Sequence, residues 1–124
     1  MPARKPEEVH ELFAQAIAAG DVNAVVALYE PDAILVAGPG QVVKGRAAIR
    51  EALGGYLALK PVFTLQSSKV WQSGDTALLL SRWAITETDP SGRRVDSTVQ
   101  PTSVARRQAD GSWLVAIDNS SGLE

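Results

Sequence analysis

The chain has no cysteine, only one histidine and no long uninterrupted apolar run. The absence of cysteine excludes disulfides, thiolate catalysis and cysteine-ligated metals, and it fits a reducing compartment. A single histidine, His10, leaves no recognisable set of transition-metal ligands, so no metal is expected. No stretch approaches the roughly 18 apolar residues of a membrane span, and no apolar segment follows Arg4 and Lys5 as in a secretory signal. We therefore expect a cytoplasmic protein without a membrane partner.

A strong charge of one sign is also missing. The 12 Lys and Arg residues nearly balance the 14 Asp and Glu residues, and the formal net charge is -2. Because no basic stripe is present, nucleic acid is not an expected partner. The glycines of 38–40 and 54–55 do not form a nucleotide-binding pattern, so no cofactor is expected. The remaining composition is ordinary for a globular protein, and the 124 residues suit a single domain, 1–124, with one core.

What the sequence does have is a change of hydrophobic period near Pro61. Before Pro61, apolar residues recur at helical spacing, with one short strand, over 33–37; the helices are predicted over 6–19, 21–29 and 46–59. After Pro61, apolar residues tend to alternate between turn sequences, which predicts strands over 62–72, 76–87, 94–108 and 113–119. Helical periodicity followed by strand periodicity is typical of an α+β domain, with helices on one face of a curved antiparallel sheet.

Four residues predict where these elements end or bend. Gly20 can adopt the left-handed conformation that ends the first helix, and Asp21 can cap the start of the second. Pro31 is expected to stop that second helix. Pro101 lies inside the third long strand and has no N–H for a ladder. We therefore expect a bulge or an edge at Pro101, which would also help to bend the sheet.

Three segments carry a resemblance to a known family: 18–21 with 28–33, then 45–50, then 106–113. In this order and spacing the chain resembles the SnoaL-like and ketosteroid-isomerase-like branch of the nuclear transport factor 2 superfamily, over nearly its whole length. The ending Ile117-Asp118-Asn119 is similar to the SgcJ/EcaC-type subgroup. The resemblance implies a cone-shaped, cystatin-like fold, in which three N-terminal helices pack on the curved sheet. It also implies a homodimer, commonly formed through the sheet.

The resemblance also places the catalytic roles of ketosteroid isomerase on this sequence. The donor tyrosine corresponds to Phe13, the base carboxylate to Ala37 and the protonated aspartate to Ser103. Phenylalanine has no hydroxyl and alanine cannot abstract a proton, so the sequence argues against a steroid isomerase of that mechanism. Ser103 can still orient a polar atom of a substrate.

Asp118 is the residue that could supply chemistry instead. If the final strand alternates, Asp118 shares a face with Leu114 and Ala116, and the resemblance turns that face toward the cone. A carboxylate among apolar neighbours has a raised pKa, which suits it to acid/base work. The same carboxylate could instead pair with Arg82, or cap the turn Asn119-Ser120-Ser121-Gly122 that follows it. Both interpretations are open at this point.

The other expected lining residues come from the helical stripes and the strand pattern. Arg82 and Trp83 point to opposite faces of one strand, and the pattern does not decide which of them faces the cone. His10 is expected on the solvated surface, away from the stripe of Phe13. The predicted pocket wall consists of Phe13, Ile17, Tyr29, Ala37, Tyr56, Arg82, Trp83, Ala116 and Asn119.

These observations lead to one functional hypothesis and one alternative. The hypothesis is binding of a small, mostly apolar organic molecule in the cone, with cofactor-free acid/base catalysis of isomerase, cyclase or dehydratase type at Asp118, assisted by Ser103. The alternative is a non-catalytic dimerisation or association module, whose cone is filled by its own side chains. An open cavity of roughly 300 Å³ or more that holds Asp118 favours the first. A collapsed interior with Asp118 paired to Arg82 favours the second.

Overall fold

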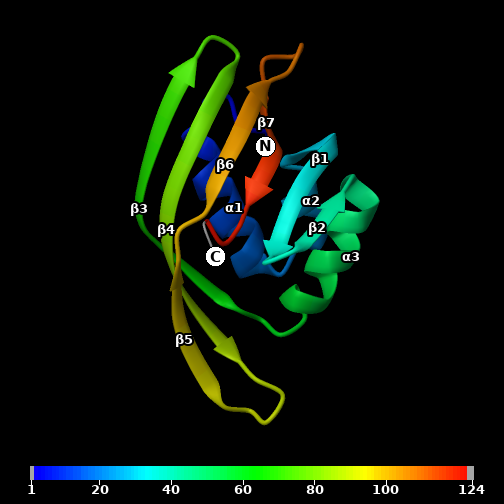
Figure 1. The fold of residues 1–124 in the computed structure, drawn as a ribbon, viewed down its shortest axis with the longest axis vertical. Helices are drawn as coiled ribbons and strands as arrows, with labels where there is room; N and C mark the ends of the chain where they lie inside the picture. Colours follow the sequence, from blue (N-terminus) through cyan, green and yellow to red (C-terminus); the bar gives the residue numbers. More distant parts are fainter. Residues whose placement is uncertain (1, 123–124) are drawn as a thin grey trace.

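Three helices pack against one curved sheet in the computed structural model, which describes residues 2–122 (Figure 1). The helices are α1 (Glu8–Ala19), α2 (Val22–Val26) and α3 (Arg46–Leu57). The strands are β1 (Tyr29–Gly38), β2 (Gln41–Lys44), β3 (Val62–Ser73), β4 (Thr76–Thr88), β5 (Arg94–Val99), β6 (Thr102–Arg107) and β7 (Trp113–Asn119). The strand order is β2-β1-β7-β6-β4-β3, and β5 pairs with β4. The predicted α+β class is confirmed.

The residues predicted to end the first helix and start the second do so. Gly20 has φ 66°, and its N–H donates to the carbonyl oxygens of Ala16 and Ile17. Only a residue that tolerates positive φ closes the helix in this way without strain. The Asp21 carboxylate then accepts a hydrogen bond of 3.1 Å from the N–H of Ala24. These two residues fix the corner between α1 and α2, and so fix which face of α1 lies over the sheet.

The prediction that α2 extends to Tyr29 is wrong. The helix ends at Val26, and Tyr29 is the first residue of β1, where it pairs with Val115 in parallel. Pro31 therefore lies within β1 rather than ending a helix. The β1–β7 register is interrupted between Tyr29 and Ile34, so the missing N–H of Pro31 removes no ladder bond. The short strand β2, which forms a hairpin with β1, is absent from the sequence-based prediction because only two apolar residues mark it.

Pro101 lies at an edge of the sheet, one of the two alternatives predicted for it, because β7 ends at Asn119 opposite Thr102, whereas the register with β4 continues without a bulge. It divides the expected third long strand into β5 and β6, which pair with the two halves of β4 in one continuous antiparallel register. The Pro101 carbonyl still accepts a hydrogen bond of 3.3 Å from the N–H of Ser81. Beyond Pro101, β5 and the end of β4 extend past the body of the sheet as a hairpin, at the bottom of Figure 1.

A bulge in β7 changes which of its side chains face inward. Val104 pairs with Ile117 and Ala105 with Val115, so Ala116 is the extra residue. Val115 is 6% exposed and Ile117 is 44% exposed, which places Val115 inside and Ile117 outside. The strict alternation expected for this strand is therefore wrong. Asp118 faces inward as predicted, but together with Val115 and not with Leu114.

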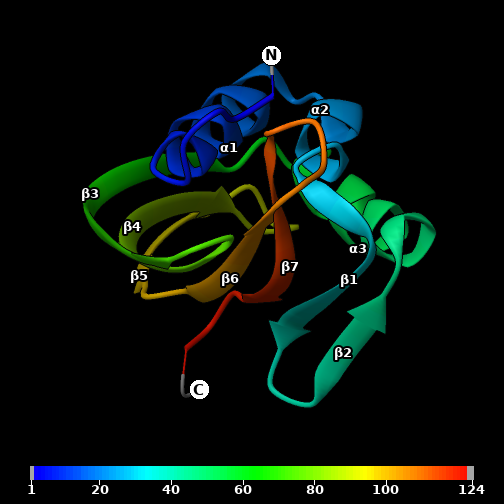
Figure 2. The same cartoon turned by 90° about the horizontal axis from the view of Figure 1, so that it is seen from above.

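The sheet curves so that α1 covers its concave side and α3 flanks it, as seen from above in Figure 2. The core between these layers contains Val9, Ile17, Tyr29, Leu35, Ile49, Leu79 and Trp113. Among residues 2–122, no helix is both long and apolar enough to cross a membrane.

Candidate functional site

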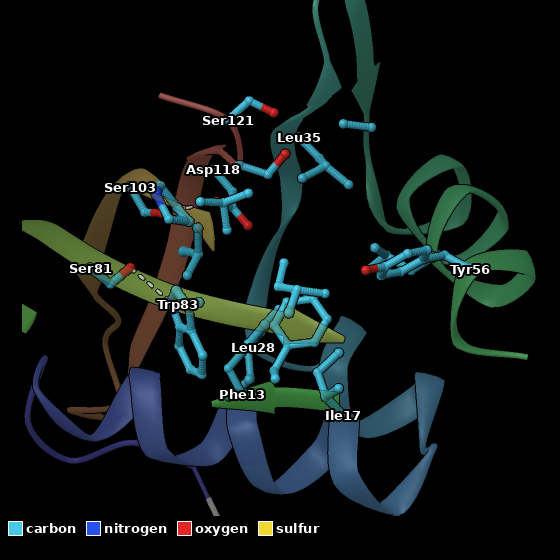
Figure 3. Close-up of a pocket in the computed structure, with 18 of the residues that line it drawn as sticks. Phe13, Ile17, Leu28, Leu35, Tyr56, Ser81, Trp83, Ser103, Asp118 and Ser121 are labelled. Carbon is cyan, nitrogen blue, oxygen red and sulfur yellow. Dashed lines mark hydrogen bonds between the residues drawn. The ribbon is translucent and has the colours of Figure 1, made fainter. Parts of the chain in front are cut away.

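A cavity of about 420 Å³ lies between the concave face of the sheet, α1 and α3. Apolar side chains form most of its wall, and a few polar groups face into it. Figure 3 shows Phe13 and Ile17 reaching it from α1, Tyr56 from α3, and Ser103 and Asp118 from the opposite side. This volume and composition are those of a site for a small organic molecule.

Asp118 is held in this cavity by two hydroxyl groups. The Tyr29 hydroxyl donates to Oδ2 at 2.6 Å, and the Ser103 hydroxyl donates to Oδ1 at 2.9 Å. Burial raises the pKa of Asp118, while the two hydrogen bonds act in the opposite direction by stabilising the anion. No ion pair to Asp118 occurs within residues 2–122. The result is a carboxylate in fixed orientation, with a raised proton affinity and no countercharge.

Tyr29 is positioned by its own backbone contacts. Arg46, at the start of α3, donates from Nε and Nη2 to the Tyr29 carbonyl oxygen at 2.9 and 2.6 Å. The Tyr29 side chain is 1% exposed, and burial together with the Asp118 carboxylate raises its pKa well above the usual value for tyrosine. Tyr29 therefore keeps its proton and acts as a permanent hydrogen-bond donor to Asp118.

Aromatic side chains form the floor of the cavity. Phe13, Phe63 and Trp83 contact one another edge to face, with ring centroids 5.9–6.0 Å apart. Tyr56 extends the cluster through Phe63, at 6.2 Å. Such pairs prefer this geometry. The floor therefore presents both faces and edges of aromatic rings, an apolar surface that is complementary to an apolar ring system.

A second carboxylate, Glu87 of β4, also lines the cavity. Burial raises the pKa of Tyr56 far above its usual value, and the negative charge of Glu87 raises it further. Tyr56 belongs to α3 and Glu87 to the hairpin of β4 and β5. The pair Tyr56 and Glu87 thus joins α3 to this hairpin at the cavity.

The family model described as SnoaL-like domain matches residues 9–115. The chain belongs to this family. The match covers all three helices except the first residue of α1, and it extends through the sheet into β7. The family resemblance of the turn and cap residues is thereby confirmed, whereas the SgcJ/EcaC-type subgroup stays a prediction.

Solved structures show the same fold for this SnoaL-like domain. A candidate calcium/calmodulin-dependent protein kinase II association domain from Xanthomonas campestris matches at 26% identity and TM-score 0.82, covering 93% of this chain and 83% of the other. A candidate dehydratase of the NTF2-like family from Streptomyces avermitilis matches at 23% identity and TM-score 0.81, with coverages of 93% and 91%. A protein with a cystatin-like fold from Caulobacter vibrioides matches at 16% identity and TM-score 0.81, with coverages of 93% and 84%. No curated protein matches the chain. The predicted NTF2-like, cystatin-like cone is confirmed.

The structure brings most of the predicted site residues of this SnoaL-like domain to one cavity. Those that line it are Phe13, Ile17, Tyr29, Ala37, Tyr56, Trp83, Ser103 and Asp118. Trp83 is 3% exposed and faces inward, which settles the choice between Trp83 and Arg82. Ser103 contacts Asp118, so its first role is to hold that carboxylate.

Three predicted lining residues do not face the cavity. Arg82 is exposed on the outer side of β4, opposite Trp83, and does not pair with Asp118. Ala116 is the bulge residue of β7, so its side chain is buried away from the cavity. Asn119 instead donates from Nδ2 to the Gly122 carbonyl oxygen at 2.6 Å, where it holds the turn after β7.

The sequence-based prediction lacks two ionisable groups of the site, His10 and Glu87, and the polar residues Gln41, Ser81, Ser97, Ser120 and Ser121. His10 is 8% exposed, so its predicted position on the solvated surface is wrong. The signal was present, because positions 10, 13 and 17 follow the helical spacing of a single stripe. Glu87 lies two residues beyond Ile85 on the inward face of β4, where strand alternation also indicates it. Among the described residues, no three side chains gather as a metal-binding group.

Proposed function

We propose that this SnoaL-like domain binds a small, mostly apolar organic molecule in its cavity, and that Asp118 exchanges a proton with it. The observation that carries the proposal is a hydrogen-bonded carboxylate without a countercharge among residues 2–122, inside an open cavity of about 420 Å³. A group of raised pKa in an apolar pocket is the usual arrangement for a catalytic acid or base.

The geometry supports a reaction that needs only proton transfers. As the anion, Asp118 would take a proton from a carbon or hydroxyl of the ligand. Tyr29 and Ser103 keep their hydroxyl protons and hold the carboxylate in place during this step. The protonated Asp118 would then return the proton at a second position, which gives an isomerisation or a cyclisation, or assists the loss of water. The similarity to a candidate dehydratase is compatible with this class of chemistry.

The alternative, an association module with a filled cone, is supported by the similarity to a candidate association domain. Two observations favour ligand binding over it. The cavity exceeds the roughly 300 Å³ expected of a ligand site, and Asp118 contacts Tyr29 and Ser103 rather than Arg82. A domain that only associates gains nothing from an oriented carboxylate in an open cavity.

Blocking the cavity tests the binding proposal. Ala37 lines the cavity and is exposed, so the Ala37→Trp variant should fill the space without disturbing the core. We expect the wild type to bind 4-hydroxybiphenyl, measured by calorimetry, and Ala37→Trp to bind it at least ~10-fold more weakly, because the ring of the new tryptophan occupies the site of the probe. Ala47→Trp is the matched control, since Ala47 is exposed on α3 and does not line the cavity. Equal binding by both variants would contradict this assignment of the site.

We also propose that the chain forms a homodimer through the outer face of the sheet. A row of apolar side chains crosses four strands there, because Trp71 pairs with Leu78, Leu78 with Val104, and Val104 with Ile117. Trp71 is 62%, Leu78 38% and Ile117 44% exposed. A contiguous exposed apolar surface of this kind is typical of an interaction site.

A charge placed in the middle of this row should separate the dimer. Leu78→Lys would bury an unpaired ammonium group in the interface, so we expect the variant to sediment as a monomer at concentrations where the wild type is a dimer. Val95→Lys is the control, because Val95 is similarly exposed, at 41%, but lies on the projecting strand β5. A wild type that sediments as a monomer at all concentrations would refute the dimer.

A cytoplasmic location is also a proposal, compatible with a chain that has no cysteine to oxidise. Fractionation of the native cells, with detection of the chain by antibody, tests it directly.

A further inference from the structure

His10 is a polar residue in an otherwise aromatic part of the cavity. It lies on the same stripe of α1 as Phe13 and Ile17, and it lines the cavity with them. Its imidazole ring is 6.4 Å from the ring of Trp83, at an interplanar angle of 57°. The side chain is 8% exposed. The polar atoms of a buried histidine are normally hydrogen-bonded, so an atom without a partner requires an explanation.

The hydrogen-bonding capacity of His10 is unused within the described chain. Among residues 2–122, Nδ1 of His10 is the buried side-chain polar atom without a partner. The nearest polar group on the neighbouring ring, the indole N–H of Trp83, donates instead to the Ser81 hydroxyl at 2.9 Å. Burial lowers the pKa of His10, so the ring is neutral and carries one proton.

The burial of Nδ1 indicates which ring nitrogen of His10 carries the proton. An orphaned buried N–H is rarer in proteins than an orphaned acceptor, so Nδ1 is best left unprotonated. The proton of the neutral ring is then on Nε2, the ring nitrogen that is not among the buried atoms without a partner. His10 lines the cavity, and within residues 2–122 no hydrogen bond from its Nε2 is present, so this N–H is free to serve a ligand.

This donor lies across the cavity from Asp118. His10 packs against Trp83 of β4, whereas Asp118 belongs to β7 and is in register, through Ser103 of β6, with Leu79 of β4. Asp118 is therefore two strand spacings, about 10 Å, from Leu79, and Trp83 lies four residues, about 13 Å, farther along β4. Figure 3 shows the neighbours of His10 on α1, Phe13 and Ile17, on the side opposite Ser103 and Asp118. His10 and Asp118 are therefore two polar groups on different sides of the cavity, with the aromatic side chains of its floor between them.

We infer that His10 is a ligand-binding residue whose Nε2–H donates a hydrogen bond to an oxygen of the ligand. The ligand class that fits is an apolar ring system with an oxygen at each end, one for His10 and one for Asp118. This inference rests on the proposed function, because it concerns the same cavity. It adds the specificity that Asp118 alone does not give.

Two probes that differ by one oxygen test the inference. We expect the wild type to bind 4,4′-dihydroxybiphenyl about 3- to 10-fold more tightly than 4-hydroxybiphenyl, as one additional hydrogen bond predicts. His10→Phe should lose this preference while still binding 4-hydroxybiphenyl. His10→Gln, which keeps an N–H donor, should recover part of it. Gln15→Phe, an exposed position of α1 that does not line this cavity, should leave it unchanged.

The single histidine gives a second measurement that needs no variant. Its imidazole nitrogens are the only ones in the chain, so their ¹⁵N resonances are assigned without overlap. We expect the neutral Nε2–H form in the free protein and a shift of the Nε2 resonance when 4,4′-dihydroxybiphenyl is added to saturation.

The outcomes separate the two proposals. If the wild type binds both probes equally, if His10→Phe keeps the preference, or if the saturating diol leaves the resonance unmoved, the inference about His10 is overturned and ligand binding stands. If the wild type binds neither probe, the proposed function fails, and the inference fails with it.

Discussion

Replacing Asp118 by asparagine should lower proton abstraction in the cavity by at least about 100-fold, because general-base catalysis contributes about 10²–10⁴-fold. A suitable probe is 5-nitrobenzisoxazole, a small flat molecule with one acidic C–H. When a base takes that proton, the ring N–O bond breaks and a coloured nitrophenolate forms. We expect the wild type to accelerate this reaction over acetate at the same pH, and Asp118→Asn to lose the acceleration. Asparagine has the same shape but no basic oxygen.

Two further variants show whether the base is Asp118. Asp32→Asn makes the same chemical change at an exposed position and should leave the rate unchanged. Glu87→Gln removes the other carboxylate of the cavity, and we expect a small effect because Glu87 lies against Tyr56. If Glu87→Gln lost the acceleration and Asp118→Asn kept it, the assignment of the base would be wrong. If the wild type showed no acceleration, the catalytic half of the proposal would be wrong.

The dependence of the same reaction rate on pH should show that the base is buried. Only the anion of Asp118 abstracts a proton, so the rate rises with pH through its pKa and then levels off. Burial raises that pKa above the usual value of an aspartate, so the rise in rate should lie at higher pH than for an exposed carboxylate. The Tyr29 hydroxyl stabilises the anion, and Tyr29→Phe should therefore move the rise to still higher pH. Tyr56→Phe, which does not contact Asp118, should move it less.

The fold could be predicted because local signals and the family resemblance agree. Gly20 and Asp21 fix the corner of the helices through their own backbone conformation and side chain, so they act without any long-range contact. Pro101 ends a strand because its ring nitrogen has no hydrogen to donate to the ladder. By contrast, the parallel pairing of β1 with β7 joins residues about 80 positions apart in sequence, and no local pattern specifies such a partner.

The candidate site was predicted less completely, for two physical reasons. The bulge at Ala116 shifts the inward face of β7 by one residue, and a bulge without glycine or proline leaves no mark in the sequence. Asp118 therefore reaches the cavity with different neighbours from those that alternation predicts. The helical pattern places Tyr29 in a helix, so it does not predict the contact of Tyr29 with Asp118. Residue type alone predicts His10 at the surface, whereas its place on the stripe with Phe13 indicates the interior.

Replacing Ile49 by alanine should lower the free energy of unfolding by about 2–5 kcal/mol. Ile49 of α3 is 0% exposed and belongs to the core cluster, together with Val25, Leu35 and Leu57. Alanine removes three carbon atoms and leaves a cavity, because the elements around the site cannot close fully around it. A loss of this size is a large part of the stability of a small domain.

Denaturant unfolding at one fixed protein concentration measures this loss, and Leu59→Ala provides the matched control. Leu59 follows α3 and is 52% exposed, so its truncation should change the free energy by no more than about 0.5 kcal/mol. Similar losses in both variants would mean that α3 does not pack on the core through Ile49. Arg46 of the same helix donates hydrogen bonds to the Tyr29 carbonyl oxygen, and the Tyr29 hydroxyl donates to Asp118. The Ile49→Ala variant should therefore also weaken the hydrogen bond that orients Asp118. The rate of proton abstraction should then fall before the protein unfolds, since the position of the base depends on the packing of this helix.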